Sequence, residues 1–264
     1  EVMREFKKRG FDCVLITRRD LDASFKNIGR VFGFFFHKSR LLASSKYVFL
    51  NDNFMPMAFL NFKKDAVVTQ LWHAEGAFKR FGLSIEQPEA VRKNELAGDK
   101  KLNFVVCSSK AVAPVYAEAF GVKEEQVLPL GAPRADFLLK KENAENSRKK
   151  IETLYPTSKN RQIVLYAPTF RGTKEENETL LSHFDFDLFQ KEFGEEYALF
   201  VKLHPQVHES IKMPPFVTDV TDYGDVRELV LACDVLITDY SSICMDFSLL
   251  SKKTVFFAYD EEKY

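Results

Sequence analysis

Short apolar runs, each followed by polar residues, recur along the chain and alternate with helical patterns. Their length and their content of β-branched and aromatic side chains are typical of buried strands. We expect strands at residues 13–17, 47–50, 66–72, 103–107, 126–130, 162–166, 198–203, 216–220, 234–238 and 254–259. Helices are expected between them, the clearest at residues 110–120, 184–193 and 225–232.

Strands alternate with helices on both sides of a strongly charged stretch at residues 138–160. This alternation predicts parallel sheets covered by helices, and 264 residues are enough for two such domains. The fold class we expect is therefore α/β, with an N-terminal domain at residues 1–137 and a C-terminal domain at residues 138–264. The chain starts inside a helical pattern and stops just after a strand-like run, so we expect both domains to be truncated at those ends.

One apolar run, RVFGFFF at residues 30–36, has two interpretations. Its phenylalanines could insert into a bilayer surface, or the run could be a strand covered by other elements. The run is short and has no helical periodicity, which favours the covered strand.

Composition narrows the possible functions. Lys plus Arg equals Asp plus Glu, at 38 each, so no overall charge favours nucleic acid or an anionic surface. The four cysteines are dispersed without metal-ligand spacing, which is typical of reduced residues in a cytoplasmic protein. No apolar run approaches 18 residues, the length needed to cross a membrane.

Polar side chains repeatedly follow the carboxyl ends of the expected strands. They are Asn51 and Asp52, His73, Ser108 and Ser109, Arg171, His204, Ser241 and Ser242. Ligands of parallel sheets bind outside these strand ends, so the pattern predicts a binding site there. No dinucleotide fingerprint, P-loop, zinc-protease motif or nucleophile elbow is present.

The stretch DVLITDYSSICMDF, residues 234–247, joins a strand to a helix through two serines. Ser241 and Ser242 could be ordinary helix caps, since serine is a common cap. They could also bind phosphate, because unpaired N–H groups and the partial positive charge of a helix start attract anions. The stretch alone leaves both interpretations open.

Several motifs occur together in order: TQLWHAEGAFKRFG, GAPRADF, LYAPTFRG, KLHP, ITDYSSICMDF and, near the end, FFAYDEEKY. With them the chain resembles the CDP-glycerol glycerophosphotransferases of wall teichoic acid and related capsule synthesis, over roughly residues 40–264. Many members have glycine after the Trp-His pair, where this chain has Ala74, and its loop is one residue longer. This departure bears on which acceptor is used more than on the type of reaction.

The resemblance implies two Rossmann-like domains facing across a cleft, as in GT-B enzymes, without a bound metal or cofactor. The C-terminal half would bind a CDP-linked polyol, and Arg171, His204, Ser241 and Ser242 would contact its diphosphate. Asp239 would support this site, whereas Lys202 is expected to be structural.

The N-terminal half would bind the acceptor, with His73 as general base, since imidazole titrates near neutral pH. Glu75 could orient His73, and Asp52 or Glu75 would be the next candidates for the base if His73 bound the diphosphate instead. Lys79 and Arg80 could hold an anionic acceptor such as a lipid-linked phosphate sugar, with Asn51 as a further supporting residue. Further expectations place His37, His183 and His208 on the surface and Arg134 at the crossing between the domains.

The function we expect is transfer of glycerol phosphate from CDP-glycerol to an acceptor hydroxyl, with release of CMP. CDP-ribitol is the alternative donor. A GT-B glycosyltransferase or sugar-nucleotide epimerase, and a non-catalytic nucleotide-binding module, are the alternatives from other classes. The resemblance also implies a cytoplasmic enzyme at the inner face of the bacterial membrane, with peripheral membrane contact and without nucleic acid as a partner.

Overall fold

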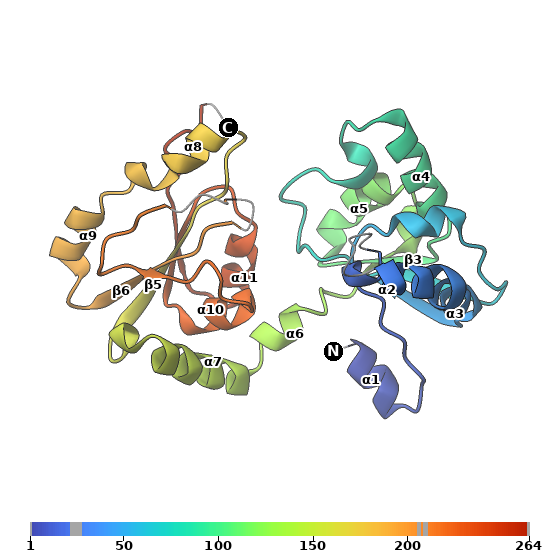
Figure 1. The fold of residues 1–264 in the computed structure, drawn as a ribbon, viewed down its shortest axis with the longest axis horizontal. Helices are drawn as coiled ribbons and strands as arrows, with labels where there is room; N and C mark the ends of the chain where they lie inside the picture. The colour runs from blue at the N-terminus through green and yellow to red at the C-terminus, as the bar shows by residue number, and fades with distance from the viewer. Residues whose placement is uncertain (1, 22–27, 205–206, 208–210, 263–264) are drawn as a thin grey trace. The chain divides into compact units, whose positions relative to one another are not determined.

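The protein is described by a computed structural model that covers residues 2–21, 28–204, 207 and 211–262. Its contacts divide the chain into two compact units, unit 1 at residues 1–134 and unit 2 at residues 135–264 (Figure 1). Each unit has its own parallel sheet with helices around it. The α/β class with two parallel-sheet domains is therefore confirmed.

Unit 1 contains a four-stranded parallel sheet in the order β1-β2-β3-β4. Its strands are β1 Tyr47–Leu50, β2 Val67–Gln70, β3 Phe104–Cys107 and β4 Val127–Pro129. Its helices are α1 Val2–Lys8, α2 Ile28–Gly33, the π-helix Phe34–Lys38, α3 Ser39–Ser44, α4 Glu89–Asp99 and α5 Ala113–Phe120. Short 3₁₀ turns occur at Arg18–Asp20, Met55–Phe59, Gly82–Ser84, Lys110–Val112 and Glu124–Gln126.

Two strand predictions in unit 1 are wrong. Residues 13–17 form no strand in the part of the chain that the structure describes, and Val14 and Leu15 are 58% and 61% exposed. An apolar run becomes a strand only where a neighbour accepts its backbone hydrogen bonds, and that pairing is not encoded locally. The phenylalanine run is helical, with Phe34 buried and Phe35 and Phe36 exposed.

Unit 2 contains a five-stranded parallel sheet in the order β7-β6-β5-β8-β9. Its strands are β5 Gln162–Ala167, β6 Tyr197–Val201, β7 Thr218–Asp219, β8 Val235–Thr238 and β9 Lys253–Phe256. Its helices are α6 Ala135–Leu138, α7 Lys141–Leu154, α8 Lys174–Glu178, α9 Phe186–Phe193, α10 Val226–Ala232 and α11 Ile243–Leu249. Turns of 3₁₀ helix occur at Pro156–Ser158 and Leu180–His183.

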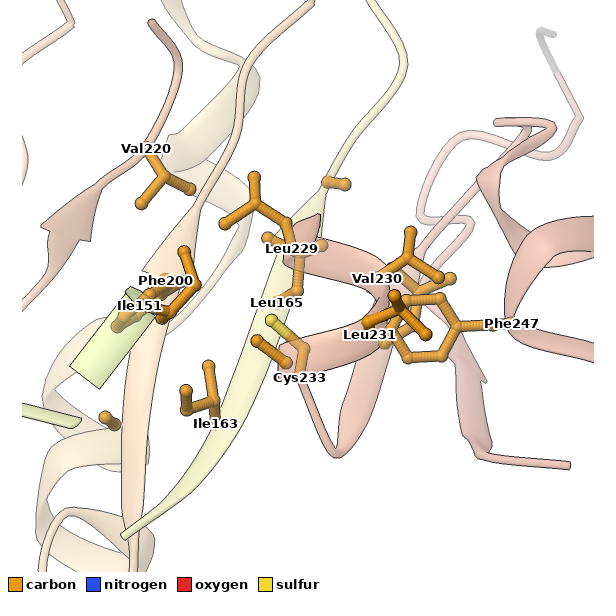
Figure 2. Close-up of a cluster of buried hydrophobic side chains, with 14 of the residues drawn as sticks. Ile151, Ile163, Leu165, Phe200, Val220, Leu229, Val230, Leu231, Cys233 and Phe247 are labelled. Atoms are coloured by element: carbon orange, nitrogen blue, oxygen red, sulfur yellow. The ribbon is translucent and has the colours of Figure 1, made fainter. Parts of the chain in front are cut away.

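The sheet of unit 2 is covered on both faces, as the alternation along β5 shows. Ile163 and Leu165 join one core cluster with residues of α7, α10 and α11, which Figure 2 shows around Leu229. Val164 and Tyr166 point to the other face and join a cluster with Leu180 and its neighbours. A strand with both faces buried has a nearly continuous apolar sequence, which is why β5 was recognisable.

Three lysines hold backbone carbonyl groups inside the units. The Lys101 ammonium donates to the carbonyls of Met57, Ala58 and Leu60 at 2.5–3.0 Å, and Lys252 donates to those of Val230, Leu231 and Cys233 at 2.6–3.0 Å. Lys202 donates to the carbonyls of Val220, Thr221 and Tyr223 at 2.8–3.4 Å. The structural role predicted for Lys202 is confirmed. Burial lowers the pKa of all three ammonium groups.

Candidate active site

In unit 1, Asp52 and His73 follow neighbouring strands. Leu50 at the end of β1 pairs in register with Gln70 at the end of β2. Asp52 and His73, which follow these two strand ends, therefore lie at the carboxyl edge of the sheet. His73 Nδ1 is 3.7 Å from Asp52 Oδ1, within ion-pair range if the imidazole is protonated but too long for a hydrogen bond. The two side chains are 49% and 42% exposed, so solvent or a substrate can reach them.

The backbone before His73 is unusual. Trp72 has a φ of 60°, in the left-handed region that a bulky side chain rarely adopts. Its ring stacks on Phe81 at 5.1 Å and meets Phe120 edge-on at 5.3 Å, which anchors the side chain in the core. On the other side of His73, Arg134 Nη1 donates a 3.1 Å hydrogen bond to the His73 carbonyl. The position of His73 is therefore fixed from both sides.

The loop after His73 is held by α5 and by the end of β3. The Tyr116 hydroxyl donates to the carbonyls of Ala74 and Gly76 at 3.1 and 3.0 Å. Burial raises the pKa of Tyr116 to about 12, so the hydroxyl stays protonated as a donor near neutral pH. Ser108, one of the strand-end serines, accepts from the Gly76 N–H at 3.2 Å. The position where this chain has Ala74 thus belongs to an ordered loop.

The other predicted residues of unit 1 have different surroundings. The Glu75 side chain is 9% exposed and its Oε1 lies 3.9 Å from Arg134 Nε, whereas the carboxylate beside the His73 ring is that of Asp52. Asn51, Lys79 and Arg80 are exposed, in the turn after β1 and in the loop after His73.

In unit 2, Arg171 is buried at the carboxyl end of β5 and pairs with two carboxylates. Its Nη2 donates to Asp239 Oδ2 at 2.9 Å and to Asp260 Oδ1 at 3.0 Å, and its Nε donates to Asp260 Oδ2 at 2.7 Å. Its Nη1 donates to the Thr169 carbonyl. Asp239 also accepts from the backbone N–H groups of Thr169 and Tyr240 at 2.8 and 2.7 Å. These bonds join the loops after β5, β8 and β9.

Charge and aromatic rings reinforce this cluster. Burial by itself would lower the pKa of the Arg171 guanidinium, but its hydrogen bonds to Asp260 and Asp239 outweigh burial and raise it. The same Arg171 hydrogen bond lowers the pKa of Asp260. The guanidinium carbon lies 5.5 Å from the ring centre of Tyr240 and 5.3 Å from that of Tyr259. One cation and two carboxylates leave this cluster without excess positive charge, so its geometry is that of a brace between loops.

The two serines lie between this cluster and α11. The Ser241 side chain is half-buried, and its hydroxyl accepts weakly from the Ile243 N–H at 3.4 Å. Ser242 is the N-cap residue of α11, yet its exposed side chain forms no capping hydrogen bond. The interpretation of Ser242 as an ordinary side-chain cap is therefore not supported, and its side chain is exposed to solvent.

His204 is exposed after the end of β6, and its ring packs on Phe170 at 4.6 Å between centroids. Phe170 precedes Arg171 in the loop after β5, so His204 and the Arg171 cluster share one edge of the sheet. His183 is exposed and stacks on Tyr259 at 3.9 Å, whereas His208 lies outside the described residues.

Sequence reasoning missed three residues at these sites. Asp260 was visible only as part of the closing FFAYDEEKY motif, because nothing local marks it as the partner of Arg171. Gln70 and Tyr116 act through hydrogen bonds to backbone groups, which no sequence motif reports. Within the described ranges, no three His, Cys, Asp or Glu side chains gather in a group that could hold a metal ion.

Comparison with known proteins extends these observations. Residues 3–264 match the family model described as CDP-Glycerol:Poly(glycerophosphate) glycerophosphotransferase. The chain is 36% identical over 232 residues to a teichoic acid poly(ribitol-phosphate) polymerase of Bacillus spizizenii, covering 84% of this chain and 37% of that protein. It is 32% identical over 231 residues to a teichoic acid glycerol-phosphate primase of Bacillus subtilis, covering 85% of this chain and 58% of the primase.

Among solved structures, the wall teichoic acid polymerase TagF is similar, with a TM-score of 0.69 and 26% identity. The match covers 83% of this chain and 56% of that structure. The chain thus spans between about a third and three fifths of the length of these relatives.

Proposed function

The chain belongs to the CDP-glycerol:poly(glycerophosphate) glycerophosphotransferase family, and on this premise we propose that it forms the transferase region of a teichoic acid or capsule enzyme. The enzyme transfers glycerol phosphate from CDP-glycerol to an acceptor hydroxyl. The observation that carries this proposal is the half-exposed His73 beside Asp52 at the carboxyl edge of the first sheet.

The proposed reaction is a displacement at the β-phosphorus of the donor. His73 takes the proton from the acceptor hydroxyl, whose oxygen forms a bond to phosphorus. The bond between this phosphorus and the bridging oxygen breaks, and CMP leaves with the electron pair. The Asp52 carboxylate, 3.7 Å away, lies beside the imidazolium that forms and supplies the opposite charge.

The donor diphosphate is proposed to meet Ser241, Ser242 and His204 in unit 2. The solvent-facing hydroxyl of Ser242 and the exposed ring of His204 can donate hydrogen bonds to phosphate oxygens. Arg171 contributes by holding the loops after β5 and β8 through Asp239, because its nitrogens already have protein acceptors. No bound metal or cofactor is included in this scheme, so protein groups stabilise the departing phosphate.

Ribitol phosphate is the second candidate for the transferred group. One observation favours it: the relative with 36% identity is named a poly(ribitol-phosphate) polymerase, whereas the primase with 32% identity is named for glycerol phosphate. Both groups would leave CMP and require the same base, so the two candidates differ only in the polyol. Lipid-linked or polymeric polyol phosphate is the proposed acceptor, with Lys79 and Arg80 at its anionic groups.

Contact with the inner face of the membrane is proposed for α2 and the π-helix that follows it. Phe32, Phe35 and Phe36 are 58%, 63% and 67% exposed. Arg30 and Arg40 are exposed in the same segment, and residues 28–44 contain no acid. Exposed aromatics flanked by cations are typical of surfaces that lie in the headgroup region of anionic bilayers. None of the described helices is long and apolar enough to span a membrane.

The proposal is tested by CMP release from the full-length protein, with CDP-glycerol and CDP-ribitol supplied separately and lipid-linked acceptors added. Acceptor-dependent release with either donor, abolished in His73→Asn, supports the transferase. Release of CMP that is unchanged in His73→Asn contradicts the assigned role of His73. Absence of release with both donors contradicts the proposed activity.

A further inference from the structure

We infer that Gln70 is a positioning residue that sets the His73 imidazole against the Asp52 carboxylate. The inference rests on the proposed function, in which His73 is the general base. Gln70 is the last residue of β2 and is only 2% exposed, so it lies behind the surface that a substrate can reach. Its effect on the reaction therefore passes through its neighbours.

The Gln70 amide joins the two turns that carry Asp52 and His73. Its Oε1 accepts a 3.0 Å hydrogen bond from the Trp72 N–H, and its Nε2 donates at 3.3 Å to the Asp52 carbonyl. One planar amide thus fixes the backbone next to the base and the backbone of the acid. Loss of this amide would release both turns together.

The hydrogen bond from Trp72 matters because of the backbone at that residue. With φ at 60°, Trp72 turns the chain sharply before His73, and a bulky residue leaves this conformation easily unless its surroundings hold it. The Gln70 side chain holds the N–H of this residue, and Phe81 and Phe120 hold its ring. A change in the Trp72 backbone would rotate the next peptide and move the imidazole.

The acid is fixed by a second set of bonds. Asp52 Oδ1 accepts a 2.8 Å hydrogen bond from the Asn53 N–H, and the Asn53 side-chain amide donates to Glu95 on α4. Glu95 also accepts from Gln87 and is 5% exposed. The turn that carries Asp52 is thus anchored to α4, and Gln70 links this anchored turn to the turn of His73.

The test uses Gln70→Met in the full-length enzyme, because methionine has a similar length but no amide. CMP release gives kcat and KM for CDP-glycerol, with rates referred to the folded fraction measured by circular dichroism. We expect kcat to fall about ten- to hundredfold, since a displacement of about 1 Å at a reacting group costs up to 10² in rate. KM for CDP-glycerol should change less than about twofold, because Gln70 does not touch the donor.

Gln126→Met is the matched control. Gln126 also holds the backbone of unit 1, through bonds to Leu102 and Asn103 at 2.9 and 3.3 Å, but it lies at the opposite edge of the sheet. Its variant should retain wild-type kcat. If Gln70→Met also retains wild-type kcat, or if both variants lose activity equally, the inference is overturned.

A double variant separates positioning from general structural damage. If Gln70 acts through His73, adding Gln70→Met to His73→Asn should lower the residual rate less than about twofold. If Gln70→Met lowers the rate of His73→Asn by the same factor as it lowers that of the wild type, Gln70 acts by another route. That result refutes the inference and leaves the proposed function intact. Wild-type turnover in His73→Asn alone would instead contradict the assigned role of His73, and absence of CMP release with both donors would refute the proposed function.

Discussion

Asp99 at the end of α4 is a buried acid whose ionisation should destabilise unit 1. The residue is 6% exposed, and its Oδ2 has no hydrogen-bond partner among the described residues. Burial raises the pKa of Asp99 to about 7 from the usual 3.8, with the charge of Glu95 one helical turn earlier as a further cause. Asp99→Asn removes this titration while keeping the size of the side chain.

The sign and size of the effect follow from proton linkage. Between pH 3.8 and about 7 the folded protein keeps a proton on Asp99 that the unfolded chain releases. The contribution of Asp99 to stability is therefore fully present below the unfolded pKa and is lost as pH rises to about 7. From pH 5 to pH 8 the wild type should lose about 2–3 kcal/mol relative to Asp99→Asn, at about 1.36 kcal/mol for each pKa unit.

Urea unfolding at pH 5 and pH 8 measures this difference. Trp72 is the only tryptophan of the chain and lies against the core of unit 1, so its fluorescence reports unfolding of that unit. Asp65→Asn, at an exposed acid of the same unit, is the control, and because it retains Asp99 its stability relative to the wild type should be the same at pH 5 and pH 8. A difference between Asp99→Asn and wild type that stays constant from pH 5 to pH 8 would refute the reasoning.

Other predictions address the two sites and the surface. His73→Asn should cut transfer by about 10²–10⁴ and leave the calorimetric Kd for CDP-glycerol unchanged, because a general base acts on the acceptor. Arg171→Ala should cost about 3–5 kcal/mol in urea unfolding, because it leaves the buried carboxylate of Asp239 unpaired; unchanged stability would contradict the bracing role. Replacing both Phe35 and Phe36 by serine should weaken binding to anionic vesicles, measured by co-sedimentation, at least tenfold, because burial of each exposed ring in the bilayer contributes about 1.5–3 kcal/mol. Binding equal to that of the wild type would exclude this segment as the membrane contact.

The strands of both sheets could be predicted because buried parallel strands have continuous apolar sequences, as in β5 and β6. The strand-end rule also brought Asp52 and His73 to one edge before any contact was known. The failures at residues 13–17 and 30–36 have a different cause. Whether an apolar run pairs or stays exposed depends on distant partners, so the sequence could not separate buried Phe34 from exposed Phe35.

The partners within each site were harder to predict than the site residues themselves. The sequence predicts Arg171 as a site residue, but its two carboxylates lie 68 and 89 residues further along the chain, after the ends of other strands. Gln70 lies three residues before His73, yet its role depends on the positive φ of Trp72, which a tryptophan does not signal. Such contacts depend on the folded geometry and on no local pattern.

The lysines that hold carbonyl groups give each unit a built-in chemical reporter. All three ammonium hydrogens of Lys101 and of Lys252 point at backbone oxygens, so an acylating reagent reaches these nitrogens only when the surrounding turn opens. Exposed Lys79 and Lys174 should react at once and serve as internal standards for the labelling. The rate of labelling at Lys101 then follows opening of unit 1, and the rate at Lys252 follows opening of unit 2. Mass spectrometry of one sample can thus time the two units separately, without any introduced probe.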